Sequence, residues 1–530
     1  MASRRDELNA YNFARKRTVA SFLKPLPNGS MESAPRPVRT ILPSVVLGMV
    51  ILVGFGACGL IKPAAPKDWD KAYANVIVGD ESTTRYVVLK TGEKDRQGRA
   101  MTQLHPVMNL ASARLLLNGE KAAVLKVKES VLDGPEAPPH GPMVGIPYAP
   151  DRLPGVDEAR AKKTWALCER PGAGQGARSQ RAVFVMSDKD SHRKKLTDSS
   201  KGKLDGRHSL FVQTPDEKKF LVDSQGIAHR LDATWYARKL GQSVKDPERF
   251  DLMMQGILFG QAQPQQVSQE WLDSLIETKA PVFLPLLQNP GGRSSTTGVD
   301  EQHRTVGKVL EADGNHFVVL HNGVAPVSDF VAKLLLEGPV GRTAYPGEEP
   351  QAIPVGVASV TPDKPRFLEE LGGHELPWPT EVTRAANSPE VGGKSVVCSV
   401  YYGGEKTIGG VSTGFPEMST WAGRDYPAPI AEGSSSYVSS GSGLLYKETM
   451  GKATEGSLFL VTDTGLRYSV PVNNDSSTTT GNDAKEKNQS QMRLGYGSIA
   501  SPPLVPKAWS RLLSAGPSLN VTDAKQPQGS

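Results

Sequence analysis

The residues best spaced for phosphate chemistry lie at 388–395, in the stretch SPEVGGKS. This stretch differs by one residue from the phosphate-binding pattern G-x-x-x-x-G-K-[ST], because Ser388 stands where the pattern needs glycine. A phosphate-binding loop follows a strand and opens a helix, whose N-terminus meets the phosphate. Here Lys394 and Ser395 lead directly into VVCSVYY, which is typical of a strand. The sequence therefore disfavours a nucleotide site at this position.

A second motif, GVSTG at 410–414, matches the hydrolase pattern G-x-S-x-G, with Ser412 in the position of the nucleophile. That pattern requires a strand, a sharp turn and a helix, whereas glycine and proline flank the motif here and predict a loop. No Asp/Glu pair stands out for glycoside hydrolysis, and the cysteines and nine histidines show no metal-ligand spacing. We therefore predict no catalytic, cofactor-binding or metal-binding residues.

The bulk composition fits a chain of several domains. Its 530 residues can bury sizeable cores, and its 53 glycines and 41 prolines predict many turns and short strands. A net charge of +6 is weak for this length, and no aromatic–basic alternation appears, so we expect no nucleic-acid partner.

An uncharged apolar stretch runs over residues 40–61, between Arg39 and Lys62. A helix that crosses a bilayer needs roughly 20 apolar residues, because backbone polar groups in lipid must bond to each other. Residues 1–39 carry eight Lys or Arg against three acidic residues, which by the positive-inside rule places them in the cytoplasm. We therefore predict a cytoplasmic arm, a transmembrane helix at 40–61 and a single-pass protein of the cytoplasmic membrane with its large C-terminal portion outside.

Three alternatives for this stretch are a buried core helix, a cleaved signal peptide and a lipoprotein signal ending at Cys58. A core helix is seldom apolar on every face, and a signal peptide has a shorter apolar core after a shorter leader. Phe55 suits a lipoprotein cleavage box poorly. In a membrane span, Gly48, Gly54 and Gly56 would allow a neighbouring helix to pack closely.

The arm contains a predicted amphipathic helix at about 6–23, with Ser3 as its cap and Pro25 at its end. Apolar side chains recur near one side, and residues 15–17 form a basic band. Such a helix can lie on anionic membrane lipid or dock on a protein partner, and the sequence does not separate the two.

A strand, a turn and a short amphipathic helix recur four times along the chain. The copies begin with RYVVLKTGEK, KKFLVDSQGIAHRL, HFVVLHNGVAPVSDF and SLFLVTDTGLRYSV. In two of the helices Trp271 or Trp509 lies at helical spacing from other apolar residues, which predicts core packing. A unit of this size cannot bury its face alone, so the four copies should pack on a shared core.

The Gly- and Pro-rich stretches between the copies, which contain short β runs, would supply that core. We predict an α+β fold: a single transmembrane helix followed by an elongated extracytoplasmic domain of four small repeat units around a β-rich core with quasi two-fold symmetry. The predicted segments are a linker at 62–82, repeat 1 at 83–130, a first core region at 131–200, repeat 2 at 205–295, repeat 3 at 300–339, a second core region at 340–450, repeat 4 at 455–516 and a disordered tail at 517–530.

Cys168 and Cys398 lie on apolar runs, one in each predicted core region. If both are outside the membrane, where disulfides persist, a bridge between them would tie the two halves of the chain together. Cys58 would remain in the membrane span as a small apolar residue.

The order of several short motifs resembles the EccB family, a membrane component of the type VII (ESX) secretion system of actinobacteria. The motifs are RRDELNAYNFARKRTVASFL before a single span, then YVVLKTG, LHPVMNLASARLLL, GIPYAPDRLPG and WALC, and the resemblance extends to about residue 513. The resemblance implies a cytoplasmic N-terminus and a four-repeat outer domain whose disulfide matches Cys168 and Cys398. It also implies a homodimer within a larger ring and partners of the EccC motor ATPase and EccD membrane-protein types.

On this resemblance we expect a structural subunit that serves protein export by assembly. Two alternatives are an extracytoplasmic ATPase, because some family members carry that label, and a membrane-anchored protein that binds the cell wall. The chain departs from the family's usual pattern in its Gly/Ser-rich stretch at 432–443.

Overall fold

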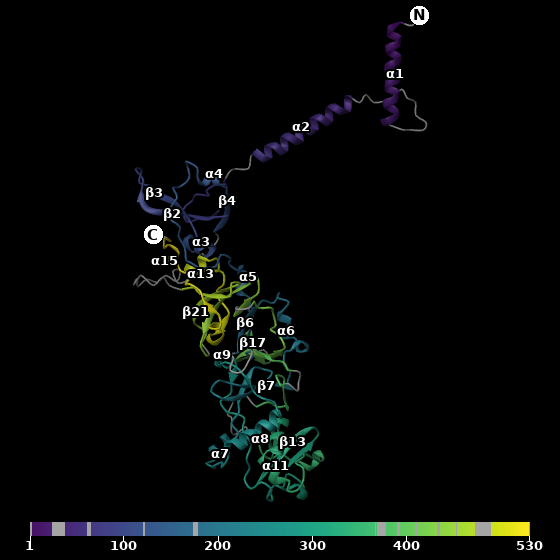
Figure 1. Ribbon diagram of the computed structural model, residues 1–530, viewed down its shortest axis with the longest axis vertical. Coiled ribbons are helices and arrows are strands. Elements are labelled where there is room, and N and C mark those ends of the chain that lie inside the picture. The colour runs from purple at the N-terminus through teal and green to yellow at the C-terminus, as the bar shows by residue number, and fades with distance from the viewer. Residues whose placement is uncertain are drawn as a thin grey trace.

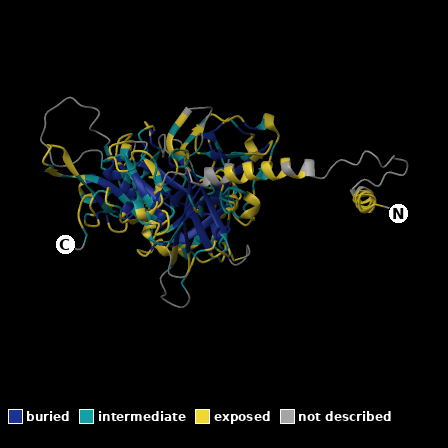
Figure 2. Ribbon diagram, turned by 90° about the horizontal axis from the view of Figure 1, so that it is seen from above, coloured by how far each residue is buried: buried dark blue, intermediate teal, exposed yellow. Residues whose placement is uncertain are grey.

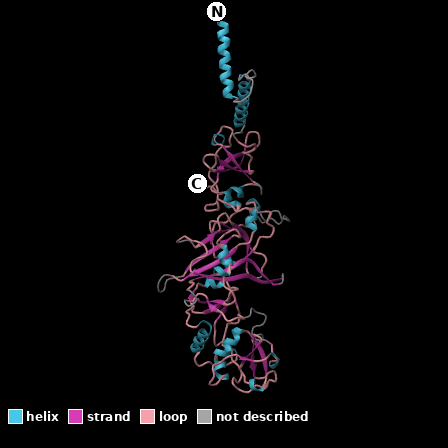
Figure 3. Cartoon of the chain, turned by 90° about the vertical axis from the view of Figure 1, so that its right-hand side faces the viewer, coloured by secondary structure: helices cyan, strands magenta, loops and turns pink. Residues whose placement is uncertain are grey.

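The computed structural model describes most of the chain as an elongated body built from several small sheets (Figures 1 and 3). The fold is mixed α+β and rich in strands, as the sequence predicts. The described residues are 3–23, 38–60, 65–119, 122–172, 179–365, 367, 378–388, 393–408, 411–431, 435–451, 453–471 and 489–528.

Two long helices precede the body. Helix α1, Arg4–Leu23, begins at a cap in which the backbone N–H of Arg5 donates to Ser3 Oγ and that of Ser3 to Asp6. Helix α2 is Val38–Leu60, and the described side chains of both helices are almost all exposed (Figure 2). Over the residues described with their side chains, no helix combines the length and the apolar character needed to cross a membrane.

The first and third sheets share one connectivity. In each, three antiparallel strands lead into a helix, and a fourth strand returns parallel to the first strand. Asn109 and Ser328 cap these helices by accepting backbone N–H groups three residues on. The elements of the first sheet are β1 Asn75–Gly79, β2 Arg85–Lys94, β3 Ala100–Pro106, α3 Leu110–Leu116 and β4 Ala123–Val127; those of the third are β12 Val309–Ala312, β13 Asn315–Leu320, β14 Gly323–Val327, α10 Asp329–Glu337, α11 Pro339–Ala344 and β15 Ile353–Pro354.

The second and fourth sheets share another connectivity. After three antiparallel strands, a short strand pairs parallel to the first, a one-turn helix follows, and a last short strand pairs parallel to the third. The elements of the second sheet are β7 His208–Gln213, β8 Lys219–Val222, β9 Ile227–Arg230, β10 Gln265–Gln266, α9 Gln269–Asp273, β11 Ile276–Glu277 and the added β16 Arg384–Ala385; those of the fourth are β20 Gly443–Thr449, β21 Ser457–Thr462, β22 Leu466–Ser469, β23 Leu504–Pro506, α14 Lys507–Ser510 and β24 Ser514–Ala515.

The remaining elements of the body are short helices between the sheets and the strands of a central sheet. The helices are α4 Glu129–Leu132, α5 Val156–Arg160, α6 Arg193–Thr197, α7 Trp235–Lys239, α8 Pro247–Phe259, α13 Gln489–Arg493 and α15 Val521–Ala524, with 3₁₀ turns at Ser199–Lys201, Glu301–His303 and Val357–Ser359. The strands are β5 Thr164–Arg170, β6 Gln180–Met186, β17 Val396–Ile408, β18 Val411–Gly423 and β19 Ser436–Val438.

The sheets pair across the two halves of the chain. One buried core joins the first sheet to the fourth through residues such as Val87 and Leu460, and we call this pair the upper lobe. Another core joins the second sheet to the third through residues such as Phe211 and Phe330, and we call this pair the lower lobe. In Figure 1 blue and yellow segments therefore lie together above the central sheet, and teal and green segments together below it.

The first and fourth sheets each begin earlier in the sequence than the predicted repeat that contains them. β1 lies within the predicted linker 62–82 and pairs with β2, so the first sheet begins before residue 83. β20 lies within the predicted second core region and pairs with β21, so the fourth sheet begins before residue 455. Gly79 and Asp80 at the end of β1 are typical of a turn, whereas the sequence of β20 is typical of a strand but is assigned to the core region. The repeat boundaries themselves stay a prediction.

The predicted disordered tail at 517–530 is wrong for residues 517–528. Leu519, Val521 and Ala524 are buried against the upper lobe, and Asn520 caps α15 by accepting the N–H of Asp523. The last described residues then pair with the segment after α4, where the N–H of Gln528 donates to the carbonyl of Met143. Apolar residues spaced among polar ones made this segment look solvated, but they anchor it to the first sheet.

The anchored C-terminal segment gives a testable prediction. Truncating Leu519, which is fully buried, to Ala should lower the local unfolding free energy of the upper lobe by about 2–4 kcal/mol. The measurement is native-state hydrogen exchange of the α3 amides, which pack against α15. Lys525→Ala, an exposed position in the same segment, is the control; equal exchange rates in the two variants would contradict the anchoring.

Candidate functional site: the disulfide-linked central sheet

The two halves of the chain meet in one five-stranded sheet with the order β18-β17-β5-β6-β19. Two neighbouring inner strands, β5 from the first half and β17 from the second, run antiparallel. The chain enters this sheet from the upper lobe, leaves it to build the lower lobe, and re-enters it from there. The upper and lower lobes are therefore joined through this sheet.

Cys168 and Cys398 lie directly opposite each other on β5 and β17 and form a disulfide. Both are fully buried, and the bond closes a loop of sequence separation 230. That loop contains both sheets of the lower lobe. The bond therefore ties the place where the lower lobe leaves the sheet to the place where it returns.

Strand alternation gives the sheet two different faces. The cysteines share one face with Phe184 and Trp421, which short loops cover. The other face carries Trp165 and Val397, and it packs against Trp271 of α9 and Trp509 of α14. The helices of the second and fourth sheets thus bury their tryptophans on the same face, which is the core role that the sequence assigns to them.

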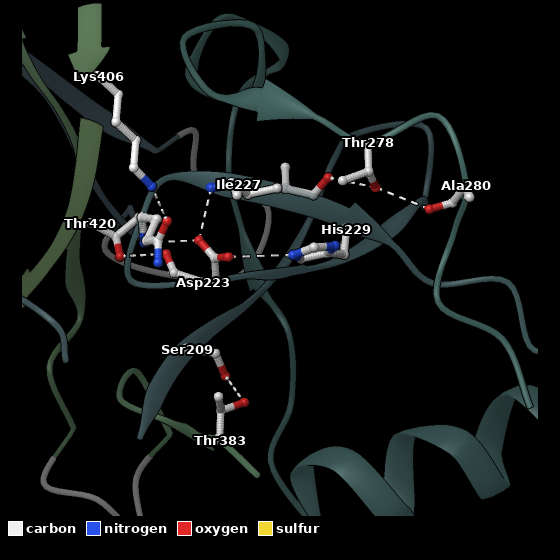
Figure 4. A network of polar contacts seen from close by, with 11 residues as sticks. Ser209, Asp223, Ile227, His229, Thr278, Ala280, Thr383, Lys406 and Thr420 are labelled. Carbon is white, nitrogen blue, oxygen red and sulfur yellow. Dashed lines mark hydrogen bonds and ion pairs between the residues drawn. The ribbon is translucent and has the colours of Figure 1, made fainter. Parts of the chain in front are cut away.

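The turn between β8 and β9 docks on one edge of the sheet (Figure 4). Asp223 shapes the turn by accepting the backbone N–H of Ile227 at 2.9 Å, and its own carbonyl accepts the hydroxyl of Thr420 on β18 at 2.7 Å. Lys406 of β17 donates to the side chain of Gln225 at 2.6 Å. Gly226 has a φ of +76° and lies so close to β18 that a side chain there would meet Met418.

The turn between β21 and β22 docks on the opposite edge in the corresponding way. Gly465 has a φ of +80°, and its carbonyl accepts the hydroxyl of Ser436 on β19. Asp463 accepts the backbone N–H of Gly441 at 2.8 Å in the loop after β19. Because exposed strand edges invite unwanted pairing, these two turns also protect the central sheet.

A buried carboxylate fixes α9 to the sheet. Glu169 on β5 is fully buried and accepts the backbone N–H of Ser268 at 2.8 Å, together with its hydroxyl. Ser268 is in turn the cap of α9, which carries Trp271. A buried charge is tolerated only when it is hydrogen-bonded, so Glu169 sets the position of this helix.

A second carboxylate holds β19. Burial would by itself raise the pKa of Asp190, but hydrogen bonds from Ser439, the N–H of His192 and Tyr437 hold its pKa below the ordinary value. Burial, with the bond to Asp190, raises the pKa of Tyr437 to about 12. Both groups thus keep their charge states across the physiological range and act as a fixed clamp.

The other residues singled out in the sequence lie apart from this sheet's core. Gly48 in α2 has no other atom near its Cβ position, and the surroundings of Gly54 and Gly56 lie outside the described residues. Lys394 and Ser395 precede β17 and do not open a helix.

Ser412 is the second residue of β18 and donates to Glu405 of β17, so residues 411–414 of the motif lie on a hairpin strand and not in a nucleophile elbow. Among the described residues, no group of three or more His, Cys, Asp or Glu side chains could hold a metal ion.

Sequence reasoning missed Glu169 and the two docking turns. The turns carry a signal, since Asp-x-x-Gly at 223–226 and Thr-Asp-Thr-Gly at 462–465 occupy the same place in two of the repeated units. What they dock on is set by sheets far away in the sequence. Glu169 carries no signal, because a charged residue at the end of an apolar run usually marks solvent exposure.

The whole chain matches one protein family. Residues 1–529 match the family described as type VII secretion system ESX-1, transport TM domain B. The chain is 24% identical to the ESX-3 secretion system ATPase EccB3 of Mycobacterium tuberculosis, covering 92% of this chain and 83% of that protein. It is 24% identical to the ESX-5 secretion system ATPase EccB5 of the same organism, covering 98% and 93%.

Solved structures show the same fold at lower identity. An EccB3 dimer from the ESX-3 core complex is 22% identical, with a TM-score of 0.54, covering 85% of this chain and all of that one. An intact ESX-5 inner membrane complex contains a chain that is 21% identical, with a TM-score of 0.51, covering 100% and 96%.

Replacing both bridged cysteines by alanine tests the role of the disulfide. In the chain-entropy account, opening a loop of this length costs up to about 5 kcal/mol, so Cys168→Ala/Cys398→Ala should unfold at markedly lower temperature in calorimetry. Hydrogen exchange should rise first in β5 and β17. Cys58→Ser removes the remaining cysteine and is the control; an unchanged unfolding temperature in the double variant would show that the bond does not support the sheet.

The docking of the β8–β9 turn can be tested with a pair of glycines. Gly226→Ala combines a positive φ with a Cβ only 3.0 Å from that of Met418, whereas Gly241, with a φ of +70°, has open space around it. The backbone cost alone is about 1–2 kcal/mol at either position. The unfolding free energy, followed in urea, should therefore fall further for Gly226→Ala than for Gly241→Ala. Equal losses would mean that the turn is not pressed against β18.

Proposed function

The chain belongs to the EccB family, the transport transmembrane domain B of type VII secretion systems, and we propose that it works there by holding a fixed shape between other subunits. The family match over residues 1–529 carries this conclusion and makes the chain a structural subunit of a type VII secretion membrane complex. The disulfide-linked sheet and the cores on both sides of it support the mechanical role, since the described sheets form one connected body.

We propose that α2 is the single membrane span, with the N-terminus in the cytoplasm. A helix of 23 residues is about 34 Å long, enough for a hydrocarbon core, and residues 40–61 carry no charge. Ala65 already packs on the outer face of the first sheet. The five peptide links from Leu60 to Ala65 span at most about 18 Å, which would hold the upper lobe close to the membrane.

In the same proposal, four repeat units surround the central sheet with quasi two-fold symmetry. The shared connectivity of the first and third sheets, and of the second and fourth, supports this arrangement. The glycine turns at 223–226 and 462–465, on opposite edges of the sheet, would be equivalent under that symmetry.

Several partners follow for such a subunit. The exposed α1, with its basic band, would contact membrane lipid or a cytoplasmic partner, and Gly48, Gly54 and Gly56 would face a neighbouring helix. We propose EccC-type and EccD-type proteins as these neighbours. We also propose a homodimer within a larger ring, supported by the EccB3 dimer among the similar structures.

The relatives' names carry the label ATPase, and ATP hydrolysis is the second candidate function. For this chain we propose no hydrolysis, because Lys394 and Ser395 lead into β17 and not into a helix whose N-terminus could meet phosphate. Cell-wall binding by the extracytoplasmic sheets is a third candidate.

Purification from membranes tests the assembly. Full-length tagged protein should co-purify with motor and channel subunits. A variant whose residues 1–61 are replaced by a cleavable signal peptide should yield a folded outer domain, no co-purification and no secretion. Normal secretion from that variant, or a solubilised monomer without partners in the parent, would overturn the proposal.

Topology is tested with a membrane-impermeant maleimide on intact cells in a Cys58→Ser background. A cysteine at Ser130 should be labelled and one at Ser33 only after lysis. In parallel, any ATP turnover should be the same in the Lys394→Ala variant. A loss confined to that variant would favour the ATPase, and sedimentation with cell-wall material would favour the wall-binding alternative.

A further inference from the structure

One short segment carries most of the chain's net charge. Residues 189–207, which connect β6 to β7 and contain α6, hold seven Lys or Arg against three Asp, a net +4 in a chain whose total is +6. In Figure 1 α6 lies beside β6 and β17, on the side of the central sheet. We call residues 189–207 the basic segment.

The three carboxylates of the basic segment already have hydrogen-bond partners within the protein. Asp190 accepts hydrogen bonds from Tyr437 and from backbone, and Asp198 caps the 3₁₀ turn that follows it. Asp205 contacts the ring Nδ1 of His208 at 2.6 Å. Asp205 also pairs with Arg207 at 3.4 Å at the surface, so the excess positive charge of the segment is carried by its lysines.

The segment is held rigidly. The indole N–H of Trp421 donates to the backbone carbonyls of both Lys195 and Lys201, at 2.8 and 2.9 Å. Leu196 is fully buried between them. Gly202 has a φ of +114°, and its Cβ position lies 2.6 Å from a backbone oxygen of β18, so this approach needs glycine. The lysines thus project from a fixed backbone.

Four of the cations, Lys189 and three lysines further along the segment, are available to a partner. Arg193 pairs with Asp188 at 3.2 Å, and the amine of Lys203 lies over the ring of Tyr402. In contrast Lys194, Lys195 and Lys201 are exposed, and no ion pair joins them to an acid within the described portion of the chain.

We propose that the basic segment is a docking surface for an acidic polypeptide segment, rich in Asp and Glu, of a protein partner outside the membrane. This inference rests on the proposed function in one respect: the proposed topology places the sheets, and therefore the partner, outside the membrane. The lysine ammonium groups are point charges on flexible stems, so they can pair with successive carboxylates of an extended acidic segment without a fixed bidentate geometry. The basic segment packs on the central sheet, whereas the first sheet is the one that directly follows α2. Membrane lipid around α2 is therefore a poorer candidate for the ligand of the basic segment than a protein.

The test measures binding of a fluorescein-labelled oligoglutamate to the full-length protein in nanodiscs of neutral lipid, by fluorescence anisotropy. Lys194→Gln/Lys195→Gln/Lys201→Gln should weaken binding at least tenfold at low ionic strength. The matched control Lys67→Gln/Lys71→Gln/Lys128→Gln removes the same charge from exposed positions before and within the upper lobe, and should change binding less than twofold. Added salt should weaken binding to the parent protein, because screening shortens the reach of exposed charges.

Three results would overturn the proposed docking surface. Equal loss in the two triple variants would mean that only net charge acts, and would overturn the proposal. Absence of binding to the parent would overturn it too, as would binding of a polyphosphate probe with no binding of oligoglutamate. Unfolding temperature and disulfide content, measured on the same samples, exclude misfolding as the cause. A failure of assembly in the co-purification above would leave this binding unchanged, so the two proposals fail separately.

Discussion

The antiparallel pairing of β5 with β17, fastened by Cys168–Cys398, is the interaction on which the rest of the structure depends. One strand comes from each half of the chain, so neither half can form the central sheet alone. The first half of the chain gives one sheet to each lobe, and the second half does the same. Each lobe is therefore built from both halves of the sequence. The two lobes of the structure therefore do not correspond to the two halves of the sequence.

The sheet faces and edges are all used. One face buries Trp165 with the tryptophans of α9 and α14, and the other buries the disulfide under loops that Trp421 and Asp190 hold in place. The two edges receive glycine turns from the second and fourth sheets. Because both faces of the central sheet are packed and both edges are contacted by turns, the sheet is suited to fixing the relative position of the lobes. A shape-keeping subunit needs this property, and a catalytic cleft does not.

The polar groups of the centre act by position. Glu169 orders the start of α9, Asp223 shapes the turn that ends against β18, and Asp463 holds the loop after β19. Each of these carboxylates accepts hydrogen bonds from backbone N–H or hydroxyl donors, which stabilise it in its position. The basic segment is the exception, because Lys194, Lys195 and Lys201 are exposed and form no ion pair with an acid in the described part of the chain.

The amino-acid sequence was enough to identify the family, through the order of its motifs, to predict the helices α1 and α2, and to place Cys168 and Cys398 on apolar strands. It was enough because apolar periodicity, caps and uncharged length are local properties. The tertiary structure was needed to learn which sheets form a lobe, that the C-terminal segment at 517–528 is anchored, and that Gly226 and Gly465 dock on β18 and β19. These depend on contacts between residues up to hundreds of positions apart, whose partners no local pattern names. A short turn rich in Asp, Ser and Gly has the same sequence whether it faces water or another sheet.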